Sequence, residues 1–385
     1  MSVDSLLGGK QIPSLYSELQ EVPDARDDQG QRHPLPAMLA LACVALLSGY
    51  QTPNAISEWV DNYGKQYLER FGFTRDEPPS QATWYRVLGS IDWSALEDRL
   101  TRWGLEVLNV LEASTKLQGI AIDGRTLRGS KKQGAAERHL LSAVAHRLGV
   151  TLTQIAVADK SNGIGSMLDL LSRLVVEGHV FTSDALLTQR ELAREILRRD
   201  GDFVFLVKRN RPQLYEDITF LFEPPLPLLR GESWPTAETV DAAHGRIERR
   251  RLQSSTMLND YVNWPGAEQV FRLQRLITEK KTGEVTTHIV YGIASLTTEE
   301  ADAKQLLRLV REHWHIESKS HWIRDVIFDE DRSQLRRGRL PHIMATLRNA
   351  VISLLHAYGI TCVAKARRRF AARPDEAMAL IGITA

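Results

Sequence analysis

The chain has 385 residues, of which 43% are hydrophobic and 25% are charged. These values are those of a soluble globular protein and exclude a predominantly disordered chain, while the length favours two or three structural units or one fold with insertions. The longest apolar run, residues 35–47, is shorter than the roughly 20 residues of a membrane span, and we expect no signal peptide. The two cysteines, Cys43 and Cys362, lie far apart, which excludes a disulfide framework and a thiolate zinc site. We therefore expect an intracellular protein without a membrane segment.

The net charge of +1 conceals an uneven distribution of charge along the chain. Residues 1–117 contain 10 basic and 16 acidic residues, whereas the remainder contains 39 basic and 32 acidic ones. The segment 332–374 contains ten basic residues and no acidic one. Such a segment is typical of contact with a polyanion such as a nucleic-acid backbone, although a solvated helix face with a basic tail has the same composition.

The first 117 residues are predicted to be helical. Apolar residues are compact in 34–47 and helically spaced in 54–67 and 96–111. The pair Pro79-Ser80 is typical of a helix start before residues 82–88. We therefore expect an all-helical N-terminal region.

From residue 117 the pattern becomes that of an α/β domain. Five strands are predicted from short apolar runs, at 119–123, 139–145, 152–158, 179–184 and 203–208. The pair Leu148-Gly149 predicts a turn, and helices are predicted at 167–177 and 188–199. Three strands followed by helix, strand, helix and strand indicate a mixed sheet in which a hairpin or meander precedes parallel crossings.

Strands return between about 224 and 300 and interrupt the α/β pattern. A proline-rich stretch at 224–235 precedes one predicted strand at 247–255 and a hairpin formed by 270–278 and 285–293. Helices are predicted at 303–320 and 340–356. We therefore divide the chain into a helical region (1–117), an α/β domain with a β insertion at about 224–300 (118–331) and a basic helical segment (332–385).

Two acidic residues, Asp123 and Asp184, each end a predicted buried strand and precede a small residue. Ligands of open α/β sheets bind where the strands end, although a single aspartate there more often caps the next turn. Glu317, in the helix predicted at 303–320, is the candidate for a third carboxylate. Mg²⁺ prefers carboxylate oxygens, and two metal ions held by three carboxylates activate a water or 3′-hydroxyl and stabilise the leaving oxygen of a phosphodiester.

Two other site chemistries fit part of this pattern. His313, His315 and His321 cluster in sequence, but the i, i+4 glutamate-containing zinc motif is absent, so zinc is less favoured. A glycosidase-type carboxylate pair fits two acids and leaves the third acid and the basic C-terminal segment unexplained. Metal-dependent phosphodiester chemistry therefore explains more of the sequence.

Several basic and aromatic residues are candidates for contacts with DNA. Basic residues after the first aspartate and at the end of the fifth strand are placed to contact a phosphate near the metal ions. Exposure to solvent without a DNA contact is the alternative for each of them. They are Arg125, Arg128, Lys131, Lys132 and Lys208. Trp314 and Trp322 are suited to stack on an unpaired base, but packing between helices is the commoner role of such residues.

Several short blocks stand in order along the chain. They read Pro-Ser-Gln-Ala-Thr-Trp-Tyr-Arg at 79–86, Ile-Asp-Gly-Arg-Thr-Leu-Arg-Gly at 122–129, Thr-Ser-Asp-Ala at 182–185, His-Gly-Arg-Ile-Glu-Arg-Arg at 244–250 and His-Trp-His-Ile-Glu at 313–317. In these blocks the sequence resembles bacterial insertion-sequence transposases of the DDE class, in the branch called H-repeat-associated transposases. The resemblance runs from about residue 21 to the C-terminus.

The sequence departs from the family pattern at a few positions. Arg125 stands where the family usually has Lys, Gly163 where it usually has Glu, and Ser318 where Asn commonly follows the glutamate. Related transposases have Arg and Lys on either side of the glutamate, and here His313 and Arg324 take those places. None of these departures removes a carboxylate.

The resemblance implies a ribonuclease-H-like catalytic domain with a β insertion, preceded by the helical region. It implies that Asp123, Asp184 and Glu317 bind metal as the catalytic triad, with Mg²⁺ as the cofactor, two ions bound and Mn²⁺ as a substitute. We also expect three regions to contact DNA. These are the 244–250 block, the arginine seven residues after Glu317 and the basic tail, with the residues Arg246, Arg249, Arg324, Arg367, Arg368 and Arg369.

The expected function is that of a DNA transposase that cuts the ends of its element and joins the 3′-hydroxyl to target DNA. Its partners are then double-stranded DNA, as terminal inverted repeats and as target, and a second copy of the chain in a homodimeric DNA complex. The helical region would bind the DNA ends or mediate dimerisation. We expect a location in the bacterial cytoplasm, at the nucleoid when the protein is bound to DNA.

Two other functions remain open at this point. One is a catalytically silent DNA-binding regulator derived from a transposase, which the three acids disfavour. The other is a structure-specific DNA nuclease without strand transfer.

Overall fold

The computed structural model describes residues 10–112, 117–127, 138–157, 163–223, 234–243, 245–336 and 338–383. The chain divides into two compact units. The first unit comprises Met1–Thr115, Gly124–Asn162 and His315–Ala385, and the second comprises Lys116–Asp123 and Gly163–Trp314. These limits cut across the three-part division drawn from the sequence, which stays a prediction. No helix within the described ranges is both long enough and apolar enough to cross a membrane.

The N-terminal part of the first unit is helical, as predicted. It contains α1 (Leu15–Gln20), α2 (Leu35–Leu47), α3 (Pro53–Trp59), α4 (Leu68–Phe71), α5 (Gln81–Ser90) and α6 (Trp93–Glu112). In α2 the side chains are buried on every side apart from Pro36, which explains a continuous apolar run without helical periodicity. Ser80 caps α5 by accepting a hydrogen bond from the Thr83 amide, so the helix start predicted at Pro79-Ser80 is confirmed.

The first unit also contains a β hairpin and the C-terminal helices. Strands β2 (Arg138–Ala145) and β3 (Thr151–Val157) are antiparallel, and helices α11 (Leu340–Ala357), α12 (Val363–Ala372) and α13 (Pro374–Ile381) follow later in the chain. Gly149 has a φ of +73°, which a turn between these strands requires and glycine adopts without strain. Helices α6 and α11 pack on β3. Their buried polar side chains meet there, since Gln154 donates a hydrogen bond to the Thr346 hydroxyl at 2.7 Å.

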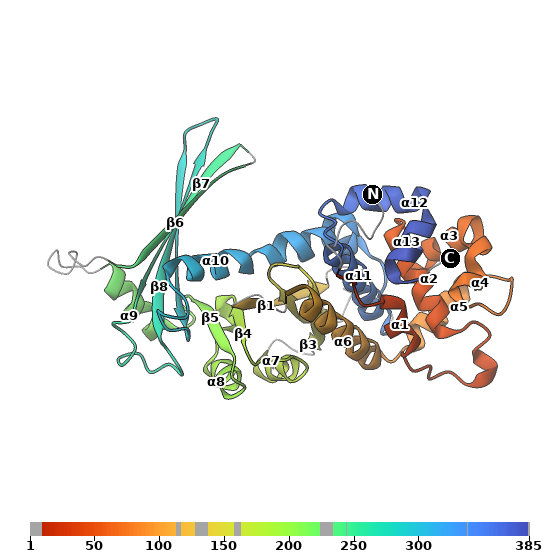
Figure 1. The fold of residues 1–385 in the computed structure, drawn as a ribbon, viewed down its shortest axis with the longest axis horizontal. Helices are drawn as coiled ribbons and strands as arrows, with labels where there is room; N and C mark the ends of the chain where they lie inside the picture. Colours follow the sequence, from red (N-terminus) through yellow and green to blue (C-terminus); the bar gives the residue numbers. More distant parts are fainter. Residues whose placement is uncertain are drawn as a thin grey trace. The chain divides into compact units, whose positions relative to one another are not determined.

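The second unit is built around parallel strands with helices on both faces. Strand β1 (Gln118–Leu127) pairs with β4 (His179–Ser183), and β4 pairs with β5 (Asp202–Val207), both in parallel. Helix α10 (Ala303–His313) packs against Val204 and Leu206 on one face. Figure 1 shows α7 (Gly163–Ser172) and α8 (Arg190–Arg198) on the other side of these strands.

An antiparallel β insertion follows helix α9 (Pro212–Phe222) in the second unit. Its strands are β6 (Thr236–Ala243), β7 (Arg246–Ser255), β8 (Gln269–Glu279) and β9 (Val285–Ala294), and they form the projecting ribbons of Figure 1. Strand β9 pairs antiparallel with β5, so the insertion extends the central sheet. On one of its faces Arg250 pairs with Asp241 and with Glu248, the latter at 2.5 Å.

Among the described residues the strand order is β3-β2-β1-β4-β5-β9-β8-β7-β6. Strand β1 belongs to both units, because its last residues from Gly124 fall in the first. Parallel pairing joins β1, β4 and β5, whereas the β2–β3 hairpin and the strands of the insertion are antiparallel. The predicted mixed sheet with a β-strand insertion, preceded by a helical region, is confirmed. Its ribonuclease-H-like character stays what the sequence resemblance implies.

Several elements differ from the sequence prediction. Helix α9 and strand β6 were not predicted; β6 is mostly exposed along its length and carries too little apolar patterning to be recognised. Strand β1 continues to Leu127, beyond the predicted end at residue 123. The helix predicted at 303–320 is α-helical only to His313 and continues in π-helical turns, η9 (Glu317–His321) and η10 (Ile323–Ile327), before the 3-10 turn η11 (Glu330–Arg332).

Candidate metal and DNA site

Asp123 and Asp184 stand at corresponding positions, just beyond the paired residues of neighbouring strands. The last paired residues of the parallel β1–β4 ladder are Ile122 and Ser183, and the two aspartates follow them directly. Neighbouring strands lie about 4.8 Å apart, so both carboxylates stand at one edge of the sheet. Because β1 continues past Asp123, this residue marks the end of the parallel pairing rather than the end of its strand.

Asp184 combines a capping role with an exposed position. Its Oδ1 accepts a hydrogen bond from the Ala185 amide at 2.8 Å, which caps the 3-10 turn η7 (Ala185–Leu187). The same oxygen lies 3.2 Å from Nζ of Lys208, and the side chain is 39% exposed. Lys208 follows β5 at the same edge of the sheet, where the sequence placed it. The capping interpretation therefore describes Asp184 correctly without excluding a ligand.

A buried hydrogen bond fixes the strand that leads to Asp184. Thr182 Oγ1 and His313 Nδ1 are 2.8 Å apart, and both side chains are buried. His313 is the last residue of α10, and Thr182 lies two residues before Asp184. The contact thus joins the end of α10 to the end of β4 inside the second unit.

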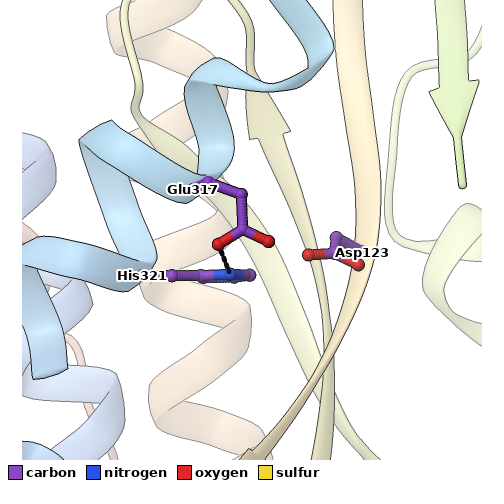
Figure 2. Close-up of side chains that lie close together, drawn as sticks. All are labelled: Asp123, Glu317 and His321. Carbon is purple, nitrogen blue, oxygen red and sulfur yellow. Dashed lines mark ion pairs between the residues drawn. The ribbon is translucent and has the colours of Figure 1, made fainter. Parts of the chain in front are cut away.

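Glu317 begins the π-helical turn η9 in the first unit, and its side chain is 67% exposed. His321 Nδ1 lies 3.5 Å from Glu317 Oε2, across one turn, as the dashed line in Figure 2 marks. π-helical turns inside helices are frequent at functional sites. The pair offers one carboxylate and one imidazole, both of which are types of metal ligand.

The donor types at these positions fit a hard divalent cation better than zinc. Asp123, Asp184 and Glu317 supply carboxylate oxygens, which suit Mg²⁺ and Mn²⁺. His313, one of the three histidines of the zinc alternative, bonds to Thr182 in the buried contact described above. His313 therefore has a structural partner, whereas His321 beside Glu317 is of a type that also binds zinc.

The residues predicted to contact DNA fall into three groups. Lys208, Arg246, Arg249, Arg368 and Arg369 are exposed. Arg125, Arg324 and Arg367 are mostly buried and engage other groups of the protein. Arg128, Lys131 and Lys132 lie outside the described residues.

Arg125 and Arg324 belong to a charge cluster in the first unit, in which the arginines and Glu330 are buried and the two aspartates are 31% exposed. We call it the Glu330 cluster: Arg125, Arg324, Asp325, Glu330, Asp331 and Arg348. Glu330 Oε2 accepts from Arg324 Nε at 2.9 Å and lies 3.2 Å from Nη2 of Arg125. Glu330 Oε1 accepts from Arg348 Nη1 at 3.0 Å. These three guanidinium groups are therefore placed for internal ion pairs.

The environment of the Glu330 cluster shifts the pKa values of Glu330, Arg125 and Arg348. Burial alone would raise the pKa of Glu330, but the guanidinium groups of Arg324, Arg348 and Arg125 outweigh it and lower that pKa to about 2. Burial lowers the pKa of Arg125 to about 10, and the neighbouring Arg324 adds to this effect. Glu330 and Arg125 are therefore both charged at neutral pH.

Arg367 has a structural environment as well. Its Nη1 donates to the backbone oxygen of Ile327, and its guanidinium lies 4.5 Å from the centre of the Phe328 ring. Burial lowers the pKa of Arg367 to about 10. Its neighbours Arg368 and Arg369 point outward, and Arg369 pairs with Glu376.

The two tryptophans near Glu317 have different surroundings. Trp314 packs on the core beneath α10, and the guanidinium of Arg275 lies 4.5 Å from the centre of its ring. This is the packing role that the sequence favoured. Trp322 is 54% exposed, so its ring is accessible for stacking.

Comparisons with known proteins show which protein family the chain belongs to. Residues 114–354 match the model of the family described as Transposase DDE domain, and residues 16–104 match one described as DDE_Tnp_1-associated. The chain belongs to the DDE transposase family. This confirms the resemblance drawn from the sequence blocks.

Similar proteins cover most of the transposase. It is 30% identical over 367 residues to "Putative transposase YncI" of Escherichia coli O157:H7. This alignment covers 89% of this chain and 87% of that protein. It is 27% identical over 357 residues to "H repeat-associated putative transposase YhhI" of Escherichia coli K12, with 90% and 91% covered. A chain of the cryo-EM structure of the piggyBac transposase synaptic complex with hairpin DNA aligns with a TM-score of 0.44 and 10% identity, covering 98% of this chain and 80% of that one.

Sequence reasoning about this transposase missed the partners of its own charged residues. Arg125 and Arg324 were interpreted as contacts to phosphate because basic residues near an acidic site suggest that role. The signal that they are internal is the acidic pair Glu330-Asp331, which begins six residues after Arg324. Sequence spacing alone does not show that these charges are buried together.

Proposed function

We propose that this transposase cuts the ends of its element and joins the resulting 3′-hydroxyl to target DNA, with Asp123, Asp184 and Glu317 as the metal-binding triad. The observation that carries the proposal is the β1–β4 register, which puts two aspartates at one edge of the sheet. A DDE domain implies a divalent metal ion, and the carboxylates are donors of the type that Mg²⁺ prefers.

In this proposal the metal ions supply the activation of the attacking oxygen and the stabilisation of the leaving oxygen. The residues of the chain hold and orient the groups around them. Asp184 keeps its position through the Ala185 amide, and Lys208 beside it is placed to attract a phosphate. The Thr182–His313 contact keeps the end of β4 in place.

The proposed DNA surface consists of exposed residues. Lys208, Arg246, Arg249, Arg368 and Arg369 are accessible to a phosphate backbone, and Trp322 is accessible to an unpaired base. Arg128, Lys131 and Lys132 remain candidates from the sequence. The buried Arg125, Arg324 and Arg367 are not part of this surface, because each engages groups within the protein. Two DNA ends are brought together in transposition, so we propose a homodimer in the DNA complex.

The test is a cleavage and joining assay on DNA that carries the segments flanking the gene. Purified wild type and Asp123→Asn are incubated with Mg²⁺ or Mn²⁺, and the products are sequenced. Cuts at the repeat ends and joined products, both absent with Asp123→Asn, are the expected result. DNA binding without cleavage, in the presence of Mg²⁺ or of Mn²⁺, would instead identify a silent regulator. Cleavage at sites other than the repeat ends, without joined products, would identify a nuclease.

We expect the charge of the basic tail to act on DNA through Arg368 and Arg369. Changing both residues to Gln should flatten the dependence of log affinity on log salt by about 0.9 per lost phosphate contact. Affinity is measured on duplex DNA at several salt concentrations. Arg367→Gln is the matched comparison, because its buried guanidinium contacts Ile327 and Phe328, and we expect it to lower stability and leave the slope unchanged. An unchanged slope in the double variant would remove the tail from the DNA surface.

A further inference from the structure

The Glu330 cluster joins parts of the first unit that are distant in sequence. Arg125 comes from β1, Arg324 from η10, Glu330 from η11 and Arg348 from α11. Arg348 Nη2 also donates to the backbone oxygen of Gln51 at 3.0 Å, which ties the cluster to the segment between α2 and α3. One carboxylate therefore binds side chains from three other elements.

Two of these elements, β1 and η10, contain or directly follow a residue of the proposed triad. Arg125 lies two residues after Asp123 on β1, and side chains two apart on a strand point to the same face. Arg324 lies seven residues after Glu317, in η10, which continues the helical segment that begins with η9 at Glu317. The cluster thus fixes the segment that follows each of these acids.

Glu330 and the three arginines of the cluster are too buried for direct contact with DNA or metal. The side chains of Arg125, Arg324 and Arg348 are 8%, 1% and 3% exposed. Glu330 is 5% exposed, and each of its oxygens already accepts from a guanidinium group. A phosphate or a cation would first have to displace these ion pairs.

Stability alone does not account for such a cluster. Buried ion pairs lose so much hydration that well-packed apolar residues of similar volume are often as stabilising or more so. What charged groups add is direction, because a guanidinium and a carboxylate hold each other in a defined geometry. The gain from this arrangement is therefore a fixed position of the joined segments.

We propose that Glu330 is a positioning residue for the metal site: through Arg125 and Arg324 it fixes the backbone that follows Asp123 and the π-helical segment that carries Glu317. This inference rests on the proposed function. Outer-shell partners of metal ligands typically change metal affinity or activity by about 10- to 100-fold when they are replaced. Arg324, expected from the sequence to contact DNA, has a structural role in this scheme.

The test compares wild type with Glu330→Gln, which keeps the shape of the side chain and removes its charge. Folding at the assay temperature is verified by circular dichroism, DNA affinity is measured without metal, and single-turnover cleavage is followed over a Mn²⁺ titration. We expect cleavage to fall about 10- to 100-fold and the half-maximal Mn²⁺ concentration to rise, with DNA affinity unchanged. A change in the metal midpoint is a result that a purely structural loss of folded protein does not give.

Two further variants keep the outcome decisive. Glu195→Gln removes the exposed pair that Glu195 forms with Arg198 at 2.6 Å on α8, and it should cleave as wild type does. Arg125→Lys keeps the charge and loses the fork of the guanidinium, so it should show a smaller loss of the same kind even where Glu330→Gln does not fold. Wild-type cleavage and an unshifted metal midpoint in folded Glu330→Gln or in Arg125→Lys would overturn the inference. Absence of cleavage by the wild type would instead refute the proposed function.

Discussion

Asp184→Asn is expected to lower DNA cleavage by about 1,000-fold or more while DNA affinity stays nearly intact. The amide removes the negative charge that the proposed metal ions need, and a loss of about 4 kcal/mol of transition-state stabilisation corresponds to that factor. The fold should persist, because an asparagine oxygen accepts the hydrogen bond from the Ala185 amide as well as an aspartate does. Cleavage rates and dissociation constants on the same flanking DNA measure both quantities.

The matched control for this prediction is Asp202→Asn. Asp202 begins β5, at the opposite end of a strand beside β4, and accepts a hydrogen bond from the Ser295 hydroxyl at 2.8 Å. The same chemical change at that end of the sheet should leave cleavage in place. A collapse of DNA affinity in Asp184→Asn would mean that the residue is structural and that the metal site lies elsewhere.

Glu330→Gln is expected to lower the free energy of unfolding at neutral pH by about 3–5 kcal/mol. Removal of the carboxylate leaves the buried guanidinium groups of Arg324 and Arg348 without their partner, and uncompensated buried charge is costly. Chemical denaturation measures the difference. Glu195→Gln, which breaks an exposed pair, should change the free energy of unfolding little. A similar small cost for Glu330→Gln would contradict the contacts described for the cluster.

The same carboxylate gives a dependence of stability on pH with a defined sign. The pKa of Glu330 is about 2 in the folded protein, below its ordinary value of 4.5, so folding favours the charged form. Its contribution is complete above about pH 4.5 and is lost as the pH falls towards 2. Wild type should therefore lose about 3 kcal/mol more than Glu330→Gln across this window, as unfolding at successive pH values would reveal. Parallel pH profiles of the two proteins would refute the depressed pKa.

Local patterns were sufficient for most elements of the fold. The helix cap at Ser80 and the buried strand β4 can be predicted from residues close in sequence, and the structure confirms both. Helix α9 was missed although Pro212 stands in its first turn, where proline is favoured. The exposed strand β6 has no such local signal, because it is held by its pairing with β7.

The sequence by itself determined the family, the mixed sheet and the order in which Asp123, Asp184 and Glu317 occur, because these follow from motifs and from periodicity along the chain. Tertiary structure alone decided which charges are internal. Arg125 and Arg368 are both basic residues in basic surroundings, yet one is buried against Glu330 and the other is exposed. The difference arises from partners more than 200 residues away, as Arg125 and Glu330 are, and burial by distant segments leaves no periodic trace in the sequence around either residue.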